Sequence, residues 1–116
     1  MLRKHHIKVL LAIPGLRNIL LKKFNAKLKE VFGGNFTEVI IGGAPINNEA
    51  ESFFKKMKFP FTVGYGMTEC GPLISYQKWR KFVSGSSGKV VDTLEIKIDS
   101  EDAQNITGEI MVRGEN

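Results

Sequence analysis

The sequence predicts an α/β protein, with a βαβ piece of a parallel sheet and flanking helices followed by a β-hairpin. Two observations predict it. First, segments with the apolar spacing of a helix are followed by short apolar runs that end in glycines. Second, two segments near the C-terminus have apolar and polar residues in strict alternation. The α/β part is expected over residues 1–76, a junction loop over 77–90 and the hairpin over 91–116.

The first clear helix is expected from Leu16, and Gly33-Gly34 ends it. Because its apolar residues fall on one arc, we expect that arc to pack against the sheet. The arc consists of Leu16, Leu20, Leu21, Phe24, Leu28, Val31 and Phe32. Contact of this basic helix with an anionic membrane is the alternative.

The βαβ unit comes next. A short strand is expected over 36–41, a helix capped by Asn47 or Asn48, and a second strand in "FPFTVGY". Asn48 and Glu51 have capping-box spacing, and a core stripe is expected at Ala50, Phe53, Phe54 and Met57. Since parallel strands place ligand sites at their carboxyl ends, "GGAPI" and "GYGMTE" are expected at one edge of the sheet.

After Tyr76 the pattern changes. "QKWRKFVSGSSGK" is polar and rich in Gly and Ser, which is typical of a loop. "SGSSGK" is not followed by a helix and lacks Walker spacing, so a flexible junction is favoured over a phosphate loop. "TLEIKID" and "GEIMVRG" around "SEDAQNIT" predict a hairpin with one buried face.

Composition limits the class of protein. The 116 residues, 42% of them hydrophobic, carry a net charge of +5, which favours anionic partners. The single cysteine, Cys70, excludes an intramolecular disulfide and indicates a reducing compartment, so a cytoplasmic location is expected. The N-terminal "MLRKHHIKVLLAIPG" is interpreted as an amphipathic helix rather than a secretory signal, and His5 and His6 as surface residues. No window has the roughly twenty apolar residues of a membrane span.

"GYGMTE" has the groups of a ligand site. Tyr65 stands between Gly64 and Gly66, so its ring is open to a flat ligand such as a nucleobase. Thr68 offers a hydroxyl to phosphate, and Glu69 offers hard oxygens to magnesium. A tight turn with Tyr65 in the core and Glu69 as a cap is the alternative.

"GGAPI" supports the ligand site. Gly42 and Gly43 allow close approach of the backbone, while Ala44-Pro45 forms a flat wall without donors. Trp79 among Lys78, Arg80 and Lys81 suggests, as an alternative, a non-catalytic basic module that binds membrane or nucleic acid. Such a module has no use for Tyr65, Thr68 and Glu69 in this order, so no nucleic-acid partner is expected.

Together "GGAPI", "GYGMTE", "GSSGKVVDTLEIKI" and "GEIMVRG" resemble the adenylate-forming superfamily of AMP-binding enzymes, within it most the long-chain fatty-acid–CoA ligases. The resemblance implies that ATP and Mg²⁺ activate a fatty acid or other carboxylate as an acyl-adenylate, with CoA as the acyl acceptor. It also implies a nucleotide-binding α/β subdomain, and a hairpin that begins a barrel-like subdomain. A cytoplasmic enzyme in contact with the inner membrane face would fit these substrates.

The resemblance implies a role for each matching residue. Gly43, Ala44 and Pro45 would form a wall of the adenine pocket. Tyr65 and Gly66 would contact the nucleotide, with the Tyr65 ring on the base. Thr68 would bind phosphate, and Glu69 would hold magnesium, which makes these two the expected catalytic residues. Gly64, Gly66 and Met67 would lie near the acyl carboxylate.

The family's Ser/Thr/Gly-rich phosphate loop has no counterpart before Gly42, and its ribose-binding aspartate, hinge and mobile-domain lysine are not seen. We therefore expect an internal fragment of a longer enzyme, inactive alone, with a truncated structural homologue as the alternative. Apolar faces left uncovered are expected to make the chain self-associate.

Overall fold

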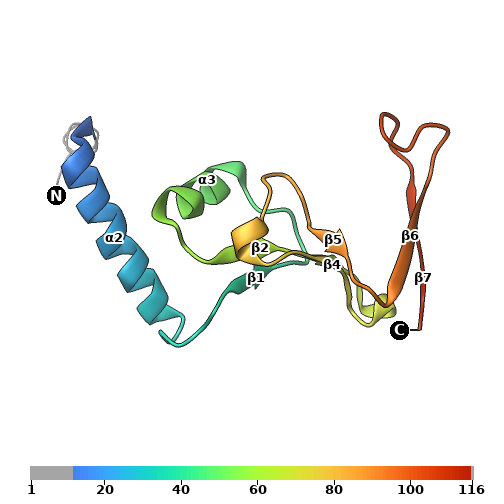
Figure 1. Ribbon diagram of the computed structural model, residues 1–116, viewed down its shortest axis with the longest axis horizontal. Coiled ribbons are helices and arrows are strands. Elements are labelled where there is room, and N and C mark those ends of the chain that lie inside the picture. The colour runs from blue at the N-terminus through green and yellow to red at the C-terminus, as the bar shows by residue number, and fades with distance from the viewer. Residues whose placement is uncertain (1–11, 116) are drawn as a thin grey trace. The chain divides into compact units, whose positions relative to one another are not determined.

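The computed structural model describes residues 12–115 (Figure 1). These residues divide into two compact units. Among the described residues, the first unit holds 12–37 together with Asn47–Pro60, and the second holds Glu38–Ile46 together with 61–115. The interpretation of "MLRKHHIKVLL" and its two histidines falls outside the described residues.

The described part of the first unit contains the helices α2 (Pro14–Val31) and α3 (Asn48–Met57). Helix α2 contacts α3 through an edge-on pair of Phe24 and Phe53 and through the Asn25 side-chain amide, which donates to the Met57 carbonyl at 3.0 Å. No residue of α2 is buried, and Phe24 is 60% exposed. Within α2, the arc that the sequence predicts to pack against the sheet therefore holds no buried residue.

Helix α3 begins after Asn47, whose side-chain oxygen accepts from the backbone N–H groups of Glu49 at 2.7 Å and Ala50 at 3.4 Å. The predicted capping box at Asn48 is wrong, because Asn48 is already the first helical residue. In the predicted stripe Met57 is buried, but Phe53 is 44% exposed. An aromatic cluster completes this unit, formed by Phe32, Phe36, Phe54 and Phe59.

The second unit begins with the predicted parallel pair, β1 (Val39–Ile41) and β2 (Phe61–Val63). Val39 lies opposite Phe61 and Ile41 opposite Val63, and all of β2 is buried. Strand β1 is shorter than expected, because Phe36 packs in the aromatic cluster of the other unit instead.

An antiparallel sheet that the sequence did not predict follows, with β4 (Leu73–Tyr76) between β3 (Tyr65–Gly66) and β5 (Lys89–Val90). Strand β5 takes the end of the expected junction loop, and the loop also holds a 3-10 turn at Trp79–Lys81. Strands β3 and β5 have two residues each, too few for a readable alternation, which is why the sequence did not indicate them as strands of this sheet.

The predicted hairpin pairing is confirmed as β6 (Leu94–Asp99) with β7 (Glu109–Gly114), but the predicted buried face is not, because Leu94 is buried while Ile110 is 44% exposed. Ile96 lies opposite Val112 and Ile98 opposite Ile110, so the apolar residues share one face. The described residues form a mixed α/β fold without a barrel, and none of their helices has the length and apolar character needed to cross a membrane.

Candidate functional site

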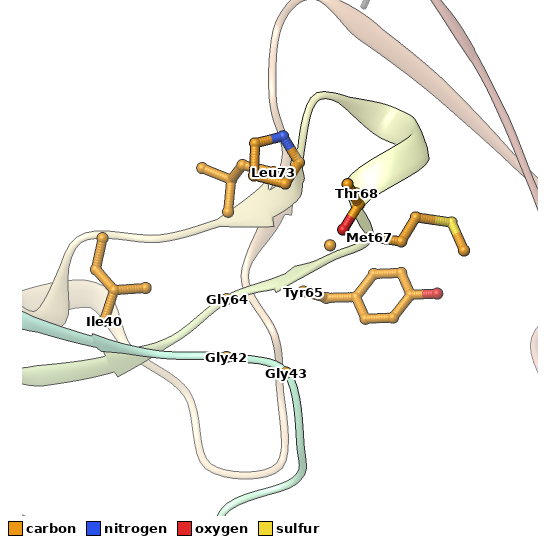
Figure 2. Close-up of a pocket in the computed structure, with 10 residues that line it drawn as sticks. Ile40, Gly42, Gly43, Gly64, Tyr65, Met67, Thr68 and Leu73 are labelled. Atoms are coloured by element: carbon orange, nitrogen blue, oxygen red, sulfur yellow. The ribbon is translucent and has the colours of Figure 1, made fainter.

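The two glycine-bearing loops meet in the second unit, where they line one hollow of about 280 Å³ (Figure 2). It lies beyond the carboxyl ends of β1 and β2, where parallel strands generally place ligand sites. Its walls are Ile40, Gly42, Gly43, Gly64, Tyr65, Gly66, Met67, Thr68, Pro72 and Leu73. The sequence indicated most of these residues, but nothing in it pointed to Ile40, Pro72 or Leu73.

The parallel pairing continues past the strands and brings the first loop to the second. The Gly64 N–H donates to the Ile41 carbonyl at 2.9 Å. A Cβ on Gly42 would lie 3.4 Å from the Gly64 carbonyl oxygen, so the two backbones run in contact. Gly43 then has φ of +80°, a left-handed conformation in which glycine is unstrained, and this turns the chain along the hollow.

The opposite wall is a bulged strand pair. The register between β3 and β4 shifts at Tyr65 and Gly66, and a Cβ on Gly66 would lie 1.9 Å from the Pro72 carbonyl oxygen. Only glycine fits there. The bulge carries the chain from Gly66 into Met67 and the 3-10 turn Thr68–Cys70.

Tyr65 and Met67 extend their side chains in the same direction from the end of β3 (Figure 2). They are 36% and 45% exposed, so the alternative of Tyr65 as a core residue is wrong. Glu69 does not cap the turn, because its N-cap residue is Met67 and no side chain caps it. The site thus combines an open aromatic ring, bare glycine backbone and the Thr68 hydroxyl.

Three of the predicted site residues do not line the hollow. Ala44 and Pro45 follow Gly43 and are exposed, and Glu69 follows Thr68 on the exposed turn. Among residues 12–115 no cluster of three His, Cys, Asp or Glu could hold a metal by itself. Magnesium on a nucleotide needs only one or two carboxylates beside phosphate oxygens and waters, and Glu69 fits that smaller requirement.

A hydrogen-bonded cluster in the second unit has no signal in the sequence. The Glu38 carboxylate accepts from the Tyr76 hydroxyl and, at 2.9 Å, from the Trp79 backbone N–H. The hydrogen bond to Glu38, helped by burial and by the carboxylate charge, raises the pKa of Tyr76. The Thr62 hydroxyl donates to the Gln77 carbonyl at 2.6 Å. These partners are distant in sequence, and no local pattern signals them.

The whole chain, residues 1–116, matches the AMP-binding enzyme family. It is 30% identical over 114 residues to long-chain-fatty-acid–CoA ligase 1 of Saccharomyces cerevisiae (strain ATCC 204508 / S288c), covering 91% of this chain and 16% of that protein. It is 31% identical over 128 residues to 4-coumarate–CoA ligase 3 of Oryza sativa subsp. japonica, covering 99% of this chain and 23% of that protein.

The chain therefore spans less than a quarter of the length of these relatives. No solved structure gives a significant match. The family match over every residue agrees with the resemblance carried by the two loops, and this chain belongs to the AMP-binding enzyme family.

Proposed function

We propose that this chain is part of an ATP-dependent carboxylate–CoA ligase. Such an enzyme joins a carboxylate to the AMP part of ATP and releases pyrophosphate. It then transfers the acyl group to the thiol of CoA, which yields a thioester and AMP. The observation that carries the proposal is the hollow where Gly42 and Gly43 meet Tyr65–Thr68.

The adenosine end of the ligand would lie against the Tyr65 ring and the backbone at Gly43, with Ala44 and Pro45 extending the wall. Stacking suits an exposed aromatic face, because every nucleobase offers a flat π surface. The close contact of Gly42 with Gly64 keeps side chains out of the space that the base would need.

Phosphate would be held by Thr68, whose hydroxyl donates a hydrogen bond to an oxygen that gains negative charge during adenylation. Glu69 would supply a carboxylate oxygen to magnesium, which neutralises phosphate charge when it is bound. Gly64, Gly66 and Met67 would lie near the carboxylate of the acyl substrate. These residues act by positioning groups and by stabilising charge.

A fatty acid is the proposed carboxylate, because three of the similar proteins are Saccharomyces cerevisiae long-chain-fatty-acid–CoA ligases, 1, 3 and 4. An aromatic acid is the second candidate, since the similarity to a rice 4-coumarate–CoA ligase covers 99% of the chain. Sulfamoyl analogues of the two acyl-adenylates, one with a long alkyl chain and one with a coumaroyl group, would distinguish these candidates by their relative affinity.

The test of the nucleotide site is calorimetric titration of a non-hydrolysable acyl-adenylate analogue into the chain. We expect Tyr65→Ala to abolish binding and Tyr65→Phe to retain it, because the ring face and not the hydroxyl makes the stack. Tyr65 is partly exposed, so neither change empties a core position. Equal binding by the Ala variant and the unmodified chain would contradict the proposal.

A further inference from the structure

A second hollow, of about 450 Å³, lies in the same unit beside the edge strand β5. It is lined by Tyr76, Gln77, Lys78, Lys81, Lys89, Val90, Val91 and Asp92. None of these residues lines the hollow at Tyr65. Strand β4 connects the two, since Leu73 at its start lines the first and Tyr76 at its end lines the second.

The three lysines of this hollow stand on backbone that hydrogen bonds hold in place. Lys89 lies opposite Tyr76 in the β4–β5 pair. The Lys81 N–H donates to the Lys78 carbonyl at 2.8 Å and closes the 3-10 turn. The Trp79 N–H anchors the same turn to Glu38 at 2.9 Å. All three lysines are exposed, so this backbone presents their ammonium groups at the surface of the hollow.

The charge of the hollow is unbalanced. Asp92 is the one carboxylate among the residues that line it, against three ammonium groups. Within residues 12–115 none of these lysines forms an ion pair. The neighbouring Arg80 lies 5.5 Å from the centre of the Trp79 ring and is not part of the lining. A hollow lined by three cationic side chains and one carboxylate favours an anionic ligand.

We propose that Lys78, Lys81 and Lys89 form a binding site for a phosphate-bearing ligand. Each ammonium group brings three hydrogen-bond donors and no acceptor, which suits phosphate oxygens. The volume falls in the range of about 300–1,000 Å³ that is common for small-molecule sites. The phosphate can belong to a soluble molecule or to a lipid headgroup, and the experiment below separates these sources.

Sodium tripolyphosphate is the soluble probe, titrated calorimetrically into the chain at constant ionic strength. We expect the triple variant Lys78→Gln, Lys81→Gln, Lys89→Gln to bind at least about tenfold more weakly, because it loses every charge-assisted contact of the site. Thermal unfolding adds a second readout. Tripolyphosphate should raise the Tm of the unmodified chain and leave that of the variant unchanged.

The matched control removes three positive charges from the other unit, through Lys22→Gln, Lys23→Gln and Lys56→Gln. It should bind tripolyphosphate like the unmodified chain. Tyr65→Ala should do so as well, which separates this site from the proposed nucleotide site. Equal weakening of tripolyphosphate binding in the two lysine variants would overturn the proposal. So would an unmodified chain that binds neither tripolyphosphate nor the lipid vesicles described next.

The lipid arm uses flotation with vesicles of phosphatidylcholine and phosphatidylglycerol at a molar ratio of about 3:1. Flotation of the unmodified chain, lost in the Lys78, Lys81, Lys89 variant and kept in the control, identifies a lipid phosphate as ligand. Tripolyphosphate binding without flotation identifies a soluble one.

Discussion

The Tyr76 hydroxyl donates a hydrogen bond to Glu38 across 38 positions of sequence, and the other oxygen of that carboxylate accepts from the Trp79 N–H. Glu38 immediately precedes β1, which leads into Gly42 and Gly43, and Tyr76 ends β4, which begins at Leu73. The carboxylate therefore links the two strands whose other ends form opposite walls of the candidate nucleotide site.

This hydrogen bond predicts a loss of stability at high pH. The raised pKa of Tyr76 means that the folded state holds the phenol proton more tightly than the unfolded chain does. The stabilisation from this hydrogen bond is complete below the ordinary tyrosine pKa of 10.0. It is lost as the pH rises through the raised pKa of Tyr76 in the folded state. Urea unfolding between pH of about 9 and 12 should show the stability of the unmodified chain falling relative to Tyr76→Phe. Lysines also titrate in this range but are common to both proteins, so parallel curves would refute the prediction.

Thr62→Val is expected to lower the free energy of unfolding by about 1–3 kcal/mol, because it leaves the Gln77 carbonyl without its donor while keeping the side-chain volume. Thr62 is fully buried and its hydroxyl is 2.6 Å from that carbonyl oxygen. Thr37→Val, at an exposed position, serves as control and should change the stability by less than about 0.5 kcal/mol. Similar losses in both variants, measured by urea unfolding, would argue against this role.

Gly66→Ala is expected to lower the free energy of unfolding by about 1–3 kcal/mol and to abolish binding of the acyl-adenylate analogue. The added Cβ would collide with the Pro72 carbonyl oxygen and force β3 from β4. Gly15→Ala in α2, where nothing lies within 4 Å, should raise stability by about 0.5–1 kcal/mol instead. An intact binding isotherm for Gly66→Ala would show that the bulge does not shape the site.

Self-association is expected from large apolar side chains that remain exposed, among them Ile110 at 44% and Met111 at 49% on β7. Sedimentation velocity at increasing concentration should show a dimer or higher oligomer, and Met111→Glu should shift the distribution towards monomer. A single monomeric species at high concentration would contradict this.

Several elements could be predicted because their signals are local. The alternation in "TLEIKID" and "GEIMVRG" predicts which side chains of β6 and β7 lie on the same face of the hairpin. The order strand–helix–strand predicts the parallel pairing of β1 with β2. Asn47 was one of two predicted caps and proved to be the cap of α3. No residue of α2 is buried, because periodicity shows only which residues are apolar whereas burial needs a partner surface.

The sequence by itself determined the family, helices α2 and α3, the parallel pair and the hairpin pairing, since motif order and short-range periodicity are properties of neighbouring residues. Only the tertiary structure decided that β3, β4 and β5 form a sheet, that Glu38 meets Tyr76, and that three lysines share one hollow. The strand pairing and the hydrogen bond at Glu38 join residues that are distant in sequence. They form only when the second unit folds, so no local pattern reveals them.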